Sequence, residues 1–286
     1  MIFDSDEICN WANGFYGYGQ YKAPVWYIGL EEAGGEYPSE VEEKFQYFAT
    51  LTPNQQLCDI RALHRNVKKT NTGHTFFDVL FGKYAKIQGT WRNLIKFSFG
   101  FFQLSTYCPK EAAILDYQKD CLTRIANTDT GNEALIELFP LPNPYSRIWA
   151  YNWAEYSTLV NQNYKILLAS IRASRKHYQN VLFKGRLRNI QKKIKKYKPK
   201  VVLFYGINDT IHKKAIIDTF ILTNTTCNVR GAIDFFYYNH TKGQPLICLI
   251  PKPPSNPKFK TNPFWFEFGV WAKSKLAGYP SACPRY

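Results

Sequence analysis

The chain has 286 residues, of which 45% are hydrophobic and 17% aromatic, a composition that excludes an intrinsically disordered protein. Its 37 basic and 22 acidic residues give a formal charge of +15, and the excess is uneven: residues 1–60 hold ten acids and two bases, whereas residues 165–214 hold fifteen bases and one acid. A basic region of this kind favours a polyanionic partner, most often a nucleic acid, with an anionic membrane surface as the alternative.

The first strand that the sequence predicts is the bulky apolar run Val25–Leu30, which is followed by two carboxylates and a glycine pair. A helix over residues 39–50 comes next, so the order is strand, glycine loop and helix. In an open α/β sheet, ligands bind at such strand ends. Glu31 and Glu32 are therefore candidates for catalysis, although acids in this position can also simply favour the start of the helix.

Further strands and helices alternate along the rest of the chain. The predicted strands cover residues 134–139, 201–206, 233–241 and 245–251, and the predicted helices cover residues 154–182, 184–200 and 263–277. Residues 52–132 separate the first two strands, and we expect them to form an insertion that shapes a substrate pocket. The alternation predicts one α/β domain, residues 1–286, with a mostly parallel central sheet of about four strands.

No apolar run approaches the length of a membrane span, and the first residues lack the pattern of a signal peptide. We therefore expect a cytoplasmic protein with no membrane partner, and a monomer. The seven cysteines are widely spaced and contain no C-x-x-C pair, which argues against a disulfide framework, a zinc site or an iron–sulfur cluster. We expect no metal and no cofactor.

Four strand-end segments together resemble motifs of the uracil-DNA glycosylase superfamily. These segments are 29–33, similar to its water-activating motif; 137–141, similar to its base-reading strand; 198–206, similar to its R-P-K strand; and 251–257, similar to its H-P-S-P-R-N-P loop. The resemblance implies a three-layer α/β/α domain, a flipped-out base bound at the carboxyl ends of the strands, and DNA as the partner. It also implies that no metal takes part.

The chain departs from these motifs at three positions. Glu32 stands in place of the motif proline, Glu137 in place of the base-reading asparagine, and Pro251 in place of the motif histidine. In the family that histidine stabilises the negative charge of the departing base. Lys252 is the nearest cationic replacement, unless the protein no longer catalyses the reaction.

Hydrolysis of the bond between deoxyribose and a base builds positive charge on the sugar and negative charge on the base. Glu31 is the first candidate for stabilising the sugar and for orienting or deprotonating a water, and Glu32 replaces it if the loop is shifted by one residue. An ionised Glu137 only accepts hydrogen bonds, which suits the amino group of cytosine or adenine and repels uracil O4. A protonated Glu137 instead donates to cytosine N3. A strand-end glutamate paired with a lysine is the alternative interpretation.

Ala33 lies where strict uracil enzymes carry a tyrosine, so it leaves room for a substituent at C5 of the base. Together with Glu137, it points to a hydroxymethylated or glucosylated cytosine, as found in some phage DNA, and hence to a resemblance to antiviral modified-base glycosylases. A ring must also stack on the flipped base. By its offset from the glycine loop, Phe45 or Tyr47 is the candidate, with a core position as the alternative.

The remaining candidates are polar residues in loops fixed by prolines, and basic residues on the helix 184–200. They are Asn143 for the base, Ser255 and Asn256 for DNA, and Lys184, Arg186, Arg188 and Lys192 for phosphates. Two alternative functions stay open: an inactive module that reads modified DNA, and a repair glycosylase for uracil or another deaminated base. The zinc signature of base deaminases, P-loops and dinucleotide-binding motifs are absent from the sequence.

Overall fold

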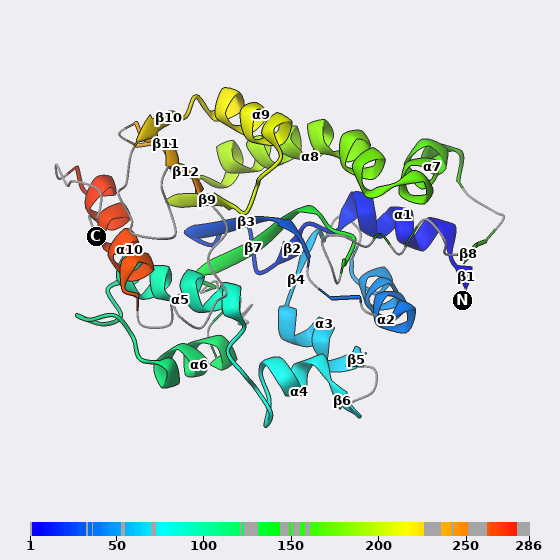
Figure 1. Ribbon diagram of the computed structural model, residues 1–286, viewed down its shortest axis with the longest axis horizontal. Coiled ribbons are helices and arrows are strands. Elements are labelled where there is room, and N and C mark those ends of the chain that lie inside the picture. The colour runs from blue at the N-terminus through cyan, green and yellow to red at the C-terminus, as the bar shows by residue number, and fades with distance from the viewer. Residues whose placement is uncertain are drawn as a thin grey trace.

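The structure is a computed structural model, and its described part covers most of the chain in segments. The described residues are 2–32, 34–35, 37–52, 55–69, 73–120, 122, 131–143, 149, 151, 155–157, 161–225, 236–241, 243–250 and 262–278. Figure 1 shows a central twisted sheet with helices on both of its faces. The predicted α/β class is therefore confirmed.

Within the described residues, the sheet contains eight strands in the order β10-β11-β12-β9-β3-β7-β2-β4. Its centre consists of four neighbouring parallel strands, which are β12 (Leu246–Ile250), β9 (Val201–Tyr205), β3 (Val25–Glu31) and β7 (Glu133–Phe139). These strands are almost entirely apolar, as expected for parallel strands that are covered on both faces. The mostly parallel sheet is thus confirmed at its centre.

The predicted number of strands, about four, was too low, because shorter strands extend the sheet at both edges. On one side β2 (Gly17–Tyr18) pairs antiparallel with β7, and β4 (Leu57–Cys58) follows it. On the other side β11 (Phe236–Asn239) and β10 (Thr223–Thr225) continue antiparallel from β12. Segments this short give little periodic signal in the sequence, which is why most of them were not predicted as strands.

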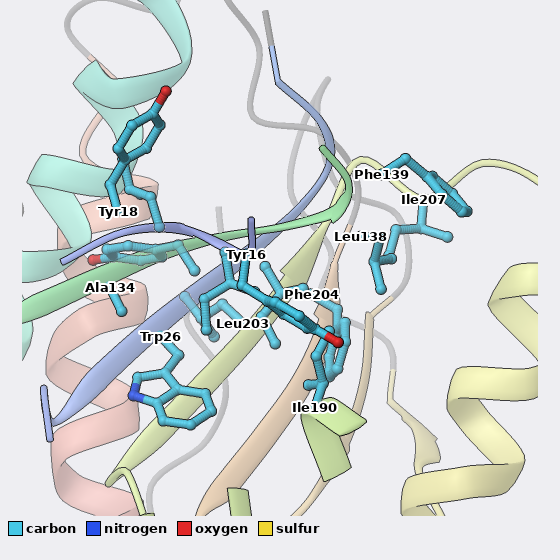
Figure 2. Close-up of a cluster of buried hydrophobic side chains, with 14 of the residues drawn as sticks. Tyr16, Tyr18, Trp26, Ala134, Leu138, Phe139, Ile190, Leu203, Phe204 and Ile207 are labelled. Carbon is cyan, nitrogen blue, oxygen red and sulfur yellow. The ribbon is translucent and has the colours of Figure 1, made fainter. Parts of the chain in front are cut away.

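One face of the sheet carries α1 (Ser5–Gly14), α8 (Arg175–Tyr197) and α9 (Thr210–Phe220), and the other carries α5 (Gly89–Phe102) and α10 (Phe264–Leu276) (Figure 1). Figure 2 shows the core under the α8 face, where Tyr16 lies beside Phe204 and Ile190 while Tyr18 points to the opposite side of the sheet. The two tyrosines flank Gly17, whose φ of 128° is open only to glycine. This divergence places Tyr18 on the face that also holds α5.

The helices α5 and α10 cross with their backbones in direct contact. A Cβ added at Gly100 would lie 2.0 Å from the carbonyl oxygen of Phe266, and one added at Gly269 would lie 2.2 Å from that of Phe97. Glycine is therefore required on both helices at this crossing. Tyr27 of β3 joins the layer to the sheet by donating a hydrogen bond to the carbonyl of Leu94 in α5.

The span 52–132, expected to be an insertion, is in part integral to the sheet. Besides β4 and α5, the described residues of this span form three helices and a small two-stranded sheet. These elements are α3 (Ile60–Asn66), β5 (Lys68–Lys69), β6 (His74–Thr75), α4 (Phe76–Leu80) and α6 (Glu111–Asp120). Because β4 is an edge strand and α5 covers a face, this span contributes to the main core.

Several predicted boundaries were wrong. The helix expected over 154–182 is divided into β8 (Glu155–Tyr156), the 3-10 helix η2 (Gln162–Tyr164), α7 (Lys165–Ala173) and the start of α8. The break occurs at Ser174, whose side chain accepts from the backbone N–H of His177 and so caps α8. The strand β8 pairs with β1 (Ile2–Phe3).

The helix that follows β3 was predicted nearly correctly. It is α2 (Pro38–Ala49), one residue earlier than expected at each end. No helix in the described part of the chain is both long and apolar enough to cross a membrane.

Candidate functional site

Three glutamates lie near the carboxyl ends of two neighbouring parallel strands. Glu31 is the last residue of β3, Glu32 follows it, and Glu137 lies in β7, where it is paired in register with Gly29. The third strand of the group, β9, ends at Tyr205. The structure thus brings together the candidates that the sequence placed at separate strand ends.

Glu31 is held by the N-terminal part of α8. The guanidinium of Arg175 contacts both carboxylate oxygens, with its Nε 2.7 Å from Oε1, and Gln179 donates to Oε1 at 2.6 Å. This bidentate arrangement is among the strong charge-assisted geometries. Both oxygens of Glu31 already accept hydrogen bonds, so Glu31 is less free to orient a water than a carboxylate with an unbonded oxygen.

Glu32 is held from a different side. Its Oε1 accepts from the ammonium of Lys44 in α2 at 2.6 Å and from the hydroxyl of Tyr18 in β2. Both members of the ion pair are buried, Lys44 to 1% exposure. The second oxygen, Oε2, is buried and has no hydrogen-bond partner in the described part of the chain. Glu32 therefore combines a fixed orientation with one oxygen to which no described residue bonds.

The loop after β3 makes this pairing possible because it turns tightly. Gly34 and Gly35 both have positive φ, and a Cβ at Gly35 would press against Val41 and Pro142. The turn returns the chain so that the first turns of α2 pass beside the end of β3. Lys44 thereby reaches Glu32 even though twelve residues separate the two in sequence.

Glu137 is buried to 7% exposure, and its carboxyl makes no hydrogen bond with any described residue. Burial, together with the negative charges of Glu32 and Glu31, raises its pKa well above the usual range for glutamate. Its surroundings therefore favour the protonated, neutral carboxyl, which can both donate and accept. The alternative interpretation, in which Glu137 forms an ion pair with a lysine, is not seen among the described residues.

Tyr205 lies beside Glu137 across the strand between them. An ideal Cβ on Gly29 would be 2.8 Å from both Glu137 Oε2 and the Tyr205 hydroxyl. Burial raises the pKa of Tyr205 well above its usual range, and Glu137 adds to the effect, so the phenol keeps its proton. Tyr205 was not predicted as a site residue from the sequence, although it is the last residue of its strand before Gly206, just as Glu31 ends β3.

His64 completes the polar interior near Glu32. It is buried in α3, its Nδ1 lies 2.6 Å from the carbonyl oxygen of Ile60, and its ring is 5.8 Å from that of Tyr18. Burial, assisted by the charge of Lys44, lowers its pKa to about 3. His64 is therefore neutral at pH 7 and supplies no positive charge there.

Phe45 and Tyr47 do not form an open stacking platform. The ring of Phe45 is 3% exposed and packs on Phe3 and Trp11, so it is a core residue and a base could stack on it only by displacing these rings. Tyr47 is half-buried and packs against the same core. Asn143 is buried beside the site, and its backbone N–H donates to the carbonyl of Glu32 at 3.1 Å.

The four basic residues expected to contact phosphates divide into two groups. Lys184, Arg188 and Lys192 are exposed at intervals of four residues along α8 and form one stripe. Arg186 is 3% exposed and donates to the carbonyls of Ala12, Phe15 and Glu137, with its guanidinium 3.9 Å from the Tyr16 ring. Its expected contact with phosphate is therefore corrected to a structural role inside the protein.

The candidates Ala33, Lys252, Ser255 and Asn256 lie outside the described residues. In the described part of the chain no group of three or more His, Cys, Asp or Glu side chains is arranged to hold a metal ion. Lys44, Tyr18 and Arg175 were also missed from the sequence. A lone lysine among the acids of α2 carries no signal that it turns inward.

With the geometry established, the chain was compared with known proteins. No protein-family model, curated protein or solved structure matches it. The site is therefore interpreted from its own residues, which offer one ion-paired carboxylate with an available oxygen and one neutral carboxyl on the next strand.

Proposed function

We propose that this protein is a monofunctional DNA glycosylase, which hydrolyses the N-glycosidic bond of a base flipped out of the helix. One observation carries the proposal. Glu32 and Glu137 lie near the ends of neighbouring parallel strands in different surroundings, because Glu32 is ion-paired with Lys44 whereas burial and nearby negative charge favour the protonated form of Glu137. Two carboxyls whose surroundings differ in this way suit glycosidic hydrolysis.

The arrangement of the four motif segments supports the same proposal. The segments that resemble the uracil-DNA glycosylase superfamily were chosen from the sequence, where they are spread over more than 200 residues. The strands that lead into or carry them, β3, β7, β9 and β12, are direct neighbours in one parallel group. Their carboxyl ends therefore lie at one edge of the sheet, where α/β enzymes bind ligands.

Glu32 rather than Glu31 is the better candidate for the carboxylate that opposes charge on the sugar. Both oxygens of Glu31 are bound by Arg175 and Gln179, whereas Oε2 of Glu32 has no described partner. In the proposed reaction Glu32 orients a water and stabilises the oxocarbenium-like sugar, while Tyr18 and Lys44 fix its other oxygen. Glu31 then acts as a positioning residue that joins the end of β3 to α8.

Glu137 reads the base in this proposal. A neutral carboxyl presents a donor and an acceptor side by side, which fits N3 and the amino group of cytosine. The same pair also fits N3–H and O4 of uracil. Repulsion of uracil O4 requires an ionised Glu137, so a neutral Glu137 does not reject uracil. The proposed preference for a C5-modified cytosine therefore depends on Ala33.

The other expected roles remain parts of the proposal. Lys252 is the candidate that opposes negative charge on the departing base, and the stripe Lys184, Arg188 and Lys192 is the candidate surface for the DNA backbone. Modified phage DNA, with an antiviral role, is the proposed natural substrate. A reader module that binds modified DNA without cleavage is the competing function, favoured by the ion pairs that hold both Glu31 and Glu32.

The test is release of free base from matched DNAs that carry uracil, cytosine, hydroxymethylcytosine or glucosylated hydroxymethylcytosine, measured by mass spectrometry. We expect release of a modified cytosine, and a loss of at least about 100-fold in rate for Glu32→Gln. Because Glu32→Gln disturbs a buried ion pair, the double variant Glu32→Gln/Lys44→Met is the check on folding. Glu111→Gln, in a partly exposed ion pair with Arg92, is the matched control and should release base at the wild-type rate.

Each other outcome selects an alternative. Release of uracil alone would keep the glycosylase and overturn the modified-cytosine substrate. A rate lost in Glu31→Gln but kept in Glu32→Gln would exchange the roles of the two residues. Binding of modified DNA with no release of any base would overturn catalysis and leave the reader module.

A further inference from the structure

Glu137 and Tyr205 approach one point of the structure from two different strands. That point is the ideal Cβ position of Gly29, 2.8 Å from Glu137 Oε2 and 2.8 Å from the Tyr205 hydroxyl oxygen. The register of the sheet explains the convergence, since Gly29 is paired with Glu137 on β7, and Ile28 is paired with Phe204, the residue before Tyr205, on β9. Side chains aligned across parallel strands point to the same face.

Neither of these two polar groups has a partner in the described part of the chain. Glu137 is more than nine-tenths buried and its Oε2 lacks a hydrogen bond. Tyr205 is half-buried, and no described residue bonds to its hydroxyl. They are also not hydrogen-bonded to each other. Buried polar atoms in native proteins are normally paired, so the unpaired Glu137 Oε2, with the hydroxyl of the half-buried Tyr205 near it, points to a ligand that bonds to both.

The residue between the two groups has no side chain. Alanine at Gly29 would place its methyl group against both oxygens and against the Tyr205 ring. Gly29 has no positive φ that would require glycine, since the positive-φ glycines are found elsewhere. The absence of a side chain here leaves the space between the two polar groups unfilled by Gly29 itself.

We propose that Glu137 and Tyr205 together bind the hydrogen-bonding edge of an uncharged nucleobase, with Tyr205 as a second specificity-determining residue. This inference rests on the proposed function, because it names the group that recognises the base. Glu137 supplies one donor and one acceptor, and the phenol supplies a second donor. The pair therefore matches a planar ring edge with adjacent acceptor and donor atoms, such as N3 and the amino group of cytosine.

The charges around the pair favour an uncharged ligand. Glu31 has its own cation in Arg175 and Glu32 has its own in Lys44. A cationic ligand would find no uncompensated carboxylate among these residues, and an anionic ligand would face their oxygens. Arg186 of α8 is bonded to carbonyl groups and lies beside Tyr16, and its positive charge offsets the negative charges around Glu137 only in part.

The experiment measures binding of 2′-deoxycytidine, its 5-hydroxymethyl derivative and 2′-deoxyuridine to the full chain by ligand-observed NMR and calorimetry. We expect Tyr205→Phe to weaken binding of its preferred nucleoside about 3- to 10-fold, the effect of one neutral hydrogen bond. Glu137→Gln, which keeps a donor and an acceptor, should stay within about threefold of wild type, whereas Glu137→Leu should lose at least tenfold. Tyr107→Phe, at an 80% exposed tyrosine, is the matched control.

A ligand change separates recognition from a merely structural role. In 3-deaza-2′-deoxycytidine the N3 acceptor is replaced by C–H, so Tyr205→Phe and Glu137→Leu together should alter its affinity much less than that of 2′-deoxycytidine. Equal losses for both ligands would overturn the inference, as would binding of no nucleoside at all, or a Tyr205→Phe affinity equal to wild type. If Glu137→Leu fails to fold, Tyr205→Phe and Glu137→Gln still decide the question.

The inference and the proposed function fail in different ways. Base release from DNA that is unchanged in Tyr205→Phe would overturn the inference while keeping the glycosylase. Nucleoside binding that depends on Tyr205 and Glu137, without base release from any DNA, would support the inference while overturning catalysis.

Discussion

Lys44 Nζ lies 2.6 Å from Glu32 Oε1 in an ion pair that is almost completely buried. Such a pair contributes little net stability compared with apolar residues, but removal of one partner leaves the other charge buried and alone. The pair fixes the orientation of the carboxylate that we propose as catalytic. It also makes the integrity of the site depend on a residue of α2.

We predict that Lys44→Met destabilises the protein by about 3–5 kcal/mol, because it leaves Glu32 uncompensated. The double variant Lys44→Met/Glu32→Gln should recover most of this loss. Urea unfolding followed by circular dichroism measures both. Lys214→Met breaks an exposed pair with Asp218 and should change stability by only about 0.5 kcal/mol or less. Equal effects at the two lysines would contradict the burial of the Lys44 pair.

The crossing of α5 and α10 gives a second prediction. Gly100→Ala should destabilise the protein by about 3 kcal/mol, because its methyl group would meet the Phe266 carbonyl oxygen at 2.0 Å and backbone cannot move aside easily. Gly185→Ala in α8 is the control, because a Cβ there meets nothing within 4 Å. This control should stabilise the protein by about 0.5–1 kcal/mol. A tolerated Gly100→Ala would mean that the helices are further apart.

The pKa of Glu137 predicts an unusual dependence of stability on pH. Glu32 and Glu31 raise this pKa in addition to burial, and Arg186 and Lys44 oppose the rise only in part. Since the folded pKa lies above the unfolded value of 4.5, folding binds a proton. The contribution of Glu137 to stability is therefore full below pH 4.5 and is lost as the pH rises towards the folded pKa.

Glu137→Gln should accordingly be about as stable as wild type at pH 4.5 and increasingly more stable above it. The difference should grow by up to about 1.4 kcal/mol per pH unit until the folded pKa is reached. Urea unfolding of both proteins between pH 4.5 and 8 measures it. Glu111→Gln serves as the control at a partly exposed carboxylate. A difference that is constant across this range would show that Glu137 is ionised.

The stripe on α8 predicts how DNA binding depends on salt. Simultaneous replacement of Lys184, Arg188 and Lys192 by alanine should weaken binding and reduce the slope of log K against log salt concentration by about 2–3, if each contacts one phosphate. The control changes three exposed lysines outside α8 by the same total charge, namely Lys83, Lys86 and Lys110. Fluorescence anisotropy between 50 and 200 mM salt measures the slopes. Equal reductions in both triple variants would indicate a general charge effect with no defined surface.

The sequence by itself determined the α/β class, the four central strands and the strand ends at which Glu31, Glu32 and Glu137 lie. It did so because apolar runs that end in glycine or proline are local signals, and because the carboxyl ends of parallel strands meet at one edge of a sheet. The start of α8 was not predicted, because the cap at Ser174 interrupts a stretch whose helical pattern continues on both sides.

Only the tertiary structure decided which of these residues are available for chemistry. Glu31 and Glu32 are adjacent in sequence, yet their contacts differ. Arg175 binds both carboxylate oxygens of Glu31, whereas Lys44 binds a single oxygen of Glu32. Arg186 belongs to a basic helix, but its position on the inner face turns it into a core residue. These differences arise from contacts between residues distant in the chain, which composition and spacing do not encode. The same contacts place Tyr205 beside Glu137 and keep that carboxyl neutral.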